Sequence, residues 1–220
     1  SYSFNPQLRY LVVEGVDAGI KIYKRSIAIE LRYSGFVIDH IVVKNNIGGG
    51  IHIAGSGPSE QIILNSVIEG NYKRNSYIPP AVYDNYGAIT VESRNESRKV
   101  TLKNVTLSNN GTNGIFSTGY ISLENCIISR NNGAGVLSDY GNVDIVHCII
   151  TENDTSFRLR DYYYSIANTI VSNNKTGNDI LGSKKRIRNS LFWNGGSTIS
   201  AKLVKVNSNG DSCDANNNVF

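Results

Sequence analysis

Five side chains in this 220-residue sequence could take part in acid–base chemistry on a sugar: His52, Glu92, Asp139, Arg158 and Arg160. A pair of carboxyl groups on either side of a glycosidic bond is the usual machinery of glycoside hydrolysis. A histidine can act as a general base, and an arginine can neutralise an acidic substrate. Their chemistry therefore depends on whether the fold brings these residues to one surface.

The composition favours an all-β repeat protein. The chain has 28 Asn, 26 Ile and 21 Gly, against 4 Pro and 18% charged residues. Asn and Gly mark bends, Ile and Val build strands, and so much Ile argues against a disordered chain. The net charge of +4 is scattered apart from residues 184–188. Because no nucleic-acid-binding module accompanies it, we expect no nucleic-acid partner. No apolar run has the length of a membrane span, which needs about 20 residues.

A motif of 21–22 residues recurs along the chain. It contains Asn-x-x-Ile-x-x-Asn, followed after a few residues by Gly-Ile-x-Ile. From Asn104 the first position of this motif recurs at spacings of 21, 22, 21 and 21, with His in place of Asn at residue 147. Three short apolar strands fit in each repeat. The sequence therefore predicts a single right-handed parallel β-helix of about eight rungs, stacked at the strand spacing of about 4.8 Å, with three parallel sheets.

These motifs resemble the pectin-lyase-like β-helix superfamily over roughly residues 7–200. The resemblance implies that the first Asn of the motif lies in the bend between the second and third strands, with its amide stacked inside the coil. Asn104 should then be buried and unglycosylated despite its sequon; the other sequons are at Asn95, Asn110, Asn153 and Asn174. The predicted ladder consists of His40, Asn65, Asn104, Asn125, His147, Asn168 and Asn189, with Tyr10 at the same position of an earlier rung.

The resemblance also implies that the Gly-Ile-x-Ile sheet carries a substrate groove. Alternation along its strands predicts which side chains face the core and which face outward. The predicted core positions are Ile51, Ile53, Ile89, Val91, Ile115, Val136 and Phe157. The predicted outward columns are His52, Thr90, Phe116, Leu137, Arg158 and Ala54, Glu92, Thr118, Asp139, Arg160. The register at Arg158 is open by one residue, and a slip would exchange the two faces.

Glu92 and Asp139 would then lie two rungs apart, about 9–10 Å, near the upper limit for an inverting glycoside hydrolase. A lyase would use an arginine base and calcium to neutralise the uronate. The alternative is that Asp139 and Arg160, on neighbouring rungs, form a cross-strand ion pair, and that His52 has no catalytic role. No cysteine or histidine spacing predicts a zinc site.

An insertion at residues 72–86 precedes one strand of this sheet. It contains Tyr72, Tyr77, Tyr83 and Tyr86, which could stack on sugar rings. Tyr120, Tyr140 and residues 162–164 follow strands of the same sheet and could line the opposite edge. The alternative is that these tyrosines only cover the edges of the rungs.

Cys126 and Cys148 occupy equivalent positions on adjacent rungs, which allows either a disulfide or a stack of reduced thiols. In the third strand of each repeat two neighbouring positions are apolar, as in Ile127-Ile128 and Ile149-Ile150. One member of each pair must face outward, giving an apolar stripe that could contact a neighbouring domain or subunit.

Two functions follow as expectations. The first is an extracellular or cell-surface β-helix that binds or processes an acidic polysaccharide as a lyase, epimerase or hydrolase. The second is a non-enzymatic adhesion scaffold, similar to the β-helix segments of Bark/Anakonda-type cell-junction proteins or to a viral or bacterial surface fibre. We expect the β-helix to span residues 1–206 and a polar tail 207–220, within a longer protein.

Overall fold

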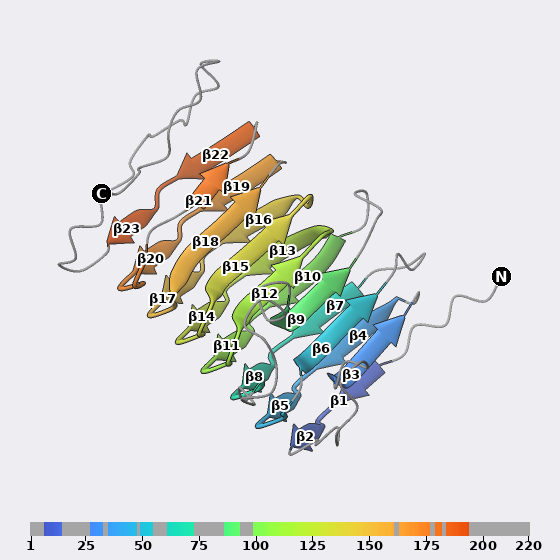
Figure 1. Ribbon diagram of the computed structural model, residues 1–220. Helices are drawn as coiled ribbons and strands as arrows, with labels where there is room; N and C mark the ends of the chain where they lie inside the picture. Colours follow the sequence, from blue (N-terminus) through green and yellow to red (C-terminus); the bar gives the residue numbers. More distant parts are fainter. Residues whose placement is uncertain are drawn as a thin grey trace.

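The computed structural model describes residues 7–14, 27–32, 35–47, 49–54, 61–72, 86–92, 99–160, 163–176, 179–181 and 184–193. In these residues the chain forms 23 short β-strands and no helix. The strands stack along one axis as a right-handed parallel β-solenoid (Figure 1). Each coil passes in turn through one strand of sheet A, one of sheet B and one of sheet C.

All strand pairs in the three sheets are parallel, and sequence-adjacent coils are sheet neighbours. Sheet A contains β1 (Gln7–Arg9), β4 (Phe36–Asp39), β7 (Gln61–Leu64), β10 (Lys99–Lys103), β13 (Tyr120–Glu124), β16 (Val143–Val146), β19 (Tyr163–Ala167) and β22 (Lys184–Arg188). Sheet B contains β2 (Val12–Glu14), β5 (Val42–Lys44), β8 (Val67–Glu69), β11 (Thr106–Ser108), β14 (Ile127–Ser129), β17 (Ile149–Thr151), β20 (Ile170–Ser172) and β23 (Leu191–Trp193). Sheet C contains β3 (Ile27–Arg32), β6 (Gly49–Ala54), β9 (Gly87–Glu92), β12 (Asn113–Ser117), β15 (Ala134–Asp139), β18 (Thr155–Arg160) and β21 (Asp179–Leu181).

The predicted all-β class and the three parallel sheets are confirmed. The solenoid has about six full turns rather than the eight rungs predicted. Sheets A and B have eight described strands and sheet C has seven, because the described part of the last coil ends with β23 in sheet B. Within the described residues, no helix is long and apolar enough to cross a membrane.

The core runs along the axis of the solenoid, where alternate side chains of all three sheets meet. The seven predicted core residues of sheet C are each at most 1% exposed. Phe157 faces inward and Arg158 pairs with Leu137, which settles the register of that rung as predicted. Alternation within each strand therefore predicted the inner face of sheet C correctly.

The A–B bend joins sheets A and B, and it contains the predicted ladder residues. Each of them has a positive φ of 47–56°, the left-handed conformation that Asn tolerates better than most residues. Their stacking is partly seen: Asn104 Nδ2 donates to Asn65 Oδ1 at 2.9 Å, and Asn168 Nδ2 lies 3.0 Å from His147 Nε2. The prediction that they are buried is wrong, because all of these side chains are exposed, including that of Asn104.

The buried asparagine ladder lies instead in the B–C bend, at the second Asn of the motif. Each ladder amide donates to the Oδ1 of the next; Asn110 Nδ2, for example, lies 2.9 Å from Asn131 Oδ1. The same Oδ1 also accepts the backbone N–H of Asn110 at 3.2 Å. Asn110 Nδ2 donates its second hydrogen to the carbonyl of Ile68 on sheet B. This ladder satisfies backbone groups that the bend would leave unpaired in the interior. Its members are at most 3% exposed: Asn46, Asn71, Asn110, Asn131, Asn153 and Asn174.

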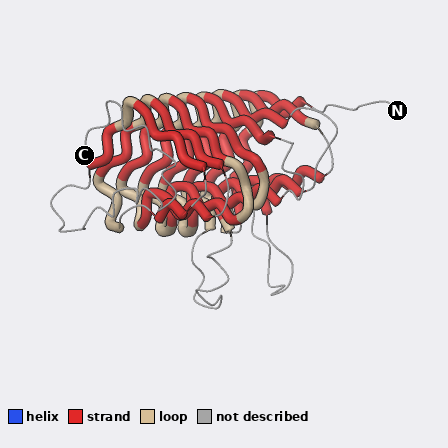
Figure 2. The backbone as a smooth tube through the Cα atoms, turned by 90° about the horizontal axis from the view of Figure 1, so that it is seen from above, coloured by secondary structure: helices blue, strands red, loops and turns tan. Residues whose placement is uncertain are grey.

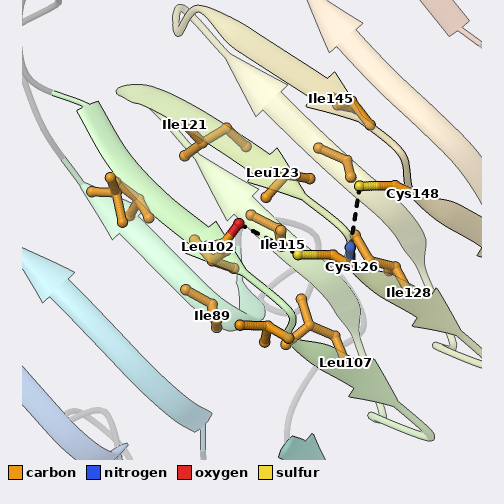
Figure 3. Packing of buried hydrophobic residues seen from close by; sticks show 14 of the residues in the cluster. Ile89, Leu102, Leu107, Ile115, Ile121, Leu123, Cys126, Ile128, Ile145 and Cys148 are labelled. Carbon is orange, nitrogen blue, oxygen red and sulfur yellow. Dashed lines mark hydrogen bonds between the residues drawn. The ribbon is translucent and has the colours of Figure 1, made fainter. Parts of the chain in front are cut away.

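A second internal ladder follows the A–B bend. The backbone N–H of Cys126 donates to Cys148 Sγ at 3.4 Å (Figure 3). The backbone N–H of Cys148 in turn donates to Thr169 Oγ1 at 3.4 Å. Both thiols are free and buried, so the stack of reduced cysteines is correct and the disulfide is not formed. The hydrogen bond to Cys126, together with burial, raises the pKa of Cys148.

The bends of successive coils lie above one another along the solenoid (Figure 2). Sheet C passes close to the asparagine ladder at the start of its strands. A Cβ on Gly135 would lie 3.1 Å from Asn153 Nδ2 and 2.8 Å from Ile150 Cγ2. The Gly of Gly-Ile-x-Ile is therefore needed for space against the bend.

Candidate functional site

The outer face of sheet C is where the predicted site residues lie. Strand pairing aligns Glu30 with His52, His52 with Thr90, and Thr90 with Phe116. The column continues through Leu137 to Arg158. In the second column Ala54 pairs with Glu92, and Asp139 pairs with Arg160. The predicted order of both columns is therefore confirmed where strands pair.

His52 lies between two carboxylates. Its Nδ1 is 3.4 Å from Glu30 Oε1, and its Nε2 is 3.4 Å from Glu92 Oε2. The histidine side chain is only 5% exposed, whereas those of Glu30 and Glu92 are 38% and 35% exposed. The buried imidazole is therefore held between carboxylates from the two neighbouring strands.

Glu30 is the member of this cluster that the sequence analysis missed. It lies on β3, before the first clear copy of the repeat, so no outward column included it. The signal that could have found it is local, since Ile29-Glu30-Leu31 has the same alternation as Ile51-His52-Ile53.

The middle of the outward column is apolar and buried. Thr90, Phe116 and Leu137 are 2%, 5% and 6% exposed, and Phe116 and Leu137 form a small cluster with Ala134 outside the main core. Thr90 Oγ1 accepts the N–H of Gly87 at 3.0 Å. The outward side chains of these rungs are therefore shielded from solvent, and a substrate groove along this sheet stays a prediction.

The other predicted catalytic residues lie at the far end of the column. Asp139 Oδ1 is 3.9 Å from Arg160 Nη1, so the ion pair considered as the alternative is confirmed. Arg158 is half-buried in the neighbouring outward position. Four strand spacings separate His52 from Arg158, about 19 Å. The five candidates thus form two clusters rather than one site.

The described tyrosines of the insertion lie at its base. Tyr72 and Tyr86 stack with ring centroids 6.3 Å apart, and the Tyr86 carbonyl accepts hydrogen bonds from Thr112 Oγ1 and Asn113 Nδ2. These contacts fit a structural role for the two rings. Tyr77 and Tyr83 lie outside the described residues.

Tyrosines and cations meet where sheet C turns into sheet A, a region that we call the C–A edge. It includes Tyr120, Tyr140, Tyr163, Arg160 and Arg186. Arg186 lies over the Tyr163 ring, 5.9 Å from its centroid, and Tyr140 is 64% exposed. This edge could stack on sugar rings and pair with carboxylates.

Two of the edge tyrosines differ from expectation. Tyr164 does not line an edge, because it points into the core and is 1% exposed. The Tyr120 hydroxyl donates a hydrogen bond to Asp144, and Lys99 Nζ is 5.8 Å from the Tyr120 ring centroid. Burial, followed by the bond to Asp144, raises the pKa of Tyr120 to about 12. Tyr162 is outside the described residues.

Calcium was expected only for a lyase. Among the described residues, no group of three or more His, Cys, Asp or Glu side chains has an arrangement that could hold a metal ion. Asp139 and Glu92, the acids expected near a uronate, contact Arg160 and His52. These residues do not fit a calcium site.

Comparisons with known proteins supply no relative: no family model, no curated protein and no solved structure matches this chain. The parallel β-solenoid is therefore the level at which its fold is assigned, and the pectin-lyase-like superfamily is not confirmed.

Proposed function

We propose that this chain is an extracellular or cell-surface β-solenoid that binds an acidic polysaccharide along its C–A edge. The observation that carries the proposal is the concentration of positive charge in the last coils. Residues 156–193 contain seven Lys and Arg against two Asp and Glu, although the whole chain has a net charge of only +4. A polyanion would be attracted to this end of the solenoid.

The placement of these charges supports contact with a sugar chain. Arg160 ends β18 with 52% of its side chain exposed, and the exposed Arg186 lies over Tyr163 on β19. Guanidinium groups form paired hydrogen bonds with carboxylates, and tyrosine rings stack on the apolar faces of sugars. The Asp139–Arg160 separation of 3.9 Å is long, so a uronate could compete for Arg160.

Binding fits the geometry better than processing does. A hydrolase needs two carboxyl groups about 5–10 Å apart on either side of one bond. Glu92 is instead in contact with His52, and Asp139 with Arg160 on a later coil. The buried Phe116 and Leu137 lie between these clusters.

The test is binding to polygalacturonate and alginate, measured by calorimetry on the full chain and on an R160Q/R186Q variant. We expect the double variant to bind at least tenfold more weakly, and wild-type affinity to fall as salt is raised. The matched control is R130Q, which removes an exposed arginine that pairs with Glu152 on the B–C bend.

Unchanged affinity in R160Q/R186Q, or an equal loss in R130Q, would overturn the edge as the binding site. No binding to any polyuronate would overturn the function. Release of unsaturated or reducing sugars, abolished in H52Q, would show that the protein also processes its ligand at His52.

A non-enzymatic scaffold remains a second proposal, and the exposed apolar face of sheet B favours it. Membership in the pectin-lyase-like superfamily is also proposed, and the buried asparagine ladder and the three parallel sheets support it.

A further inference from the structure

A single apolar column crosses sheet B from the first coil to the last. Strand pairing aligns these outward residues in register, and seven of the eight described positions are aliphatic. The column consists of Val12, Val42, Val67, Thr106, Ile127, Ile149, Ile170 and Leu191. Their neighbours one position along each strand face the core, and in the six middle coils, as at Ile128 and Ile150, these neighbours are at most 1% exposed.

This face holds most of the exposed apolar surface of the described chain. Nine large hydrophobic residues are exposed among the described residues, and five of them lie on sheet B strands: Val12, Ile127, Ile149, Ile170 and Trp193. Two more, Tyr10 and Leu11, lie on the bend that leads into β2. Exposed apolar patches of this continuity mark interaction surfaces.

Charge on the described strands of this face is confined to the first three coils, and the Arg130–Glu152 ion pair lies beside it on the B–C bend. Beside the apolar column, the outward positions are Glu14, Lys44 and Glu69, and the Lys44 and Glu14 side chains are 3.3 Å apart. The same positions in later coils are Ser108, Ser129, Thr151, Ser172 and Trp193. The face therefore has a charged half and a half with hydroxyl and aromatic side chains.

We infer that sheet B is a homodimer interface, in which a second copy packs face to face with its solenoid axis reversed. A two-fold axis parallel to the strands places coil one against coil eight and coil two against coil seven. The apolar column then lies on itself along its whole length, as a self-complementary interface requires.

The charge pattern favours this arrangement. Reversal brings Lys44 of one copy opposite Ser172 of the other, and Glu69 opposite Thr151, so no charged position meets a like charge. At both ends of the contact it brings Val12, 59% exposed, opposite Leu191, and Trp193, 61% exposed, opposite Glu14. Aromatic side chains of this kind are frequent anchors of interfaces.

The size of the face sets the expected strength. Eight strands span about 34 Å along the axis, and the outward part of each strand with its bends is about 13 Å wide. The two copies together would bury roughly 900 Å², which is below the usual range for stable specific interfaces, so the dimer should be weak and concentration-dependent.

The test is the oligomeric state of the full chain, measured by sedimentation velocity over a concentration series. We expect a monomer–dimer equilibrium in the wild type and at least a tenfold weaker dimer in an I127K/I149K variant. Both residues face solvent, so circular dichroism should show an unchanged fold. The matched control is Y140K, which changes another exposed apolar residue away from sheet B and should leave the equilibrium unchanged.

Cross-linking tests the orientation. A V42C/I170C variant should form an intermolecular disulfide between coils two and seven, whereas V42C alone should not. A monomeric wild type at all concentrations, or an unweakened dimer in I127K/I149K, would overturn the inference. Efficient cross-linking of V42C to itself would overturn the reversed packing.

Discussion

Asparagine occupies two kinds of position in each coil, and they differ in what the side chain does. In the A–B bend, Asn125 provides a left-handed backbone with φ of 53°, and its side chain is exposed. In the B–C bend, Asn131 is 1% exposed and its amide joins Asn110 above to Asn153 below. The Asn of the A–B bend therefore serves the backbone conformation, whereas the Asn of the B–C bend makes buried hydrogen bonds that link successive coils.

Replacing Asn131 with Ala should therefore cost far more than replacing Asn125. Asn131→Ala leaves the amide of Asn110 and a sheet B carbonyl without their partners, with an expected loss of about 2–4 kcal/mol. Asn125→Ala should lose about 1 kcal/mol through its positive φ, and Asn125→Gly still less. Urea unfolding of the three variants measures the difference. Equal losses at the two positions would contradict the assignment of the buried ladder.

Tyr120 offers a test of the C–A edge by pH. Its pKa of about 12 lies above the ordinary value of 10.0, so the folded state favours the protonated phenol. The resulting stability is fully present below pH 10 and is lost as the pH rises through about 12. The difference in ultraviolet absorbance between wild type and Y120F, followed against pH, should show this late ionisation. In D144N the pKa of Tyr120 should fall but stay above the ordinary value, because burial is the larger cause. Ionisation of Tyr120 near pH 10 in the wild type would contradict its burial and its hydrogen bond to Asp144.

At the scale of elements, the strands of sheet C are limited by their approach to the B–C bend. A Cβ on Gly114 would lie 2.6 Å from Ile128 Cγ2, 2.7 Å from the Gly135 carbonyl and 3.1 Å from Asn131 Nδ2. The Gly135 carbonyl is a backbone group of the next coil, so a Cβ on Gly114 could be accommodated only if the two coils moved apart. The strand start is thus held close to both the core and the ladder.

Gly114→Ala should destabilise the protein by about 1–3 kcal/mol, as overpacking does in other cores. The control is Ala88→Gly, because strand pairing places Ala88 opposite Gly114 in a coil that accommodates the methyl group. That change should cost no more than about 1 kcal/mol. Denaturant midpoints compare the two, and a neutral Gly114→Ala would show that the coils can separate locally.

The clusters on sheet C also belong to this scale. Glu30, His52 and Glu92 come from three neighbouring strands, β3, β6 and β9. Alternation predicted that His52 and Glu92 face outward, and this is correct. It did not predict their contact, because the residue opposite His52 is Thr90. Glu92 lies two positions further along the strand, and its side chain reaches back to His52.

At the scale of the whole molecule, the solenoid is a one-dimensional stack in which each coil contacts only its neighbours. Stability should then be close to a sum over coils and the interfaces between them. Residues 110–130 make one repeat of 21 residues. Their removal joins Asn109 directly to Asn131, which occupies the same position of the repeat as Asn110.

A variant lacking residues 110–130 should therefore fold as a shorter solenoid. The asparagine ladder would continue from Asn71 to Asn131, and the denaturant m-value should fall by about a tenth with the smaller surface exposed on unfolding. Circular dichroism and urea unfolding measure both effects. The control lacks only residues 110–119 and should not fold, because half a repeat shifts every later strand to another sheet. Loss of folding in the 21-residue deletion would contradict independent coils.

The sequence by itself determined the period, the three strands per coil and the inward face of each strand. These follow from local patterns, since a repeat of 21–22 residues stacks equivalent positions and alternation selects one face. Only the tertiary structure decided which Asn of the motif is buried, which outward residues of sheet C are shielded, and that Glu30 joins His52 and Glu92. All three depend on how one coil lies on the next. The geometry of the bends and the reach of side chains across strands decide this, and the spacing of residues along the chain encodes neither of them.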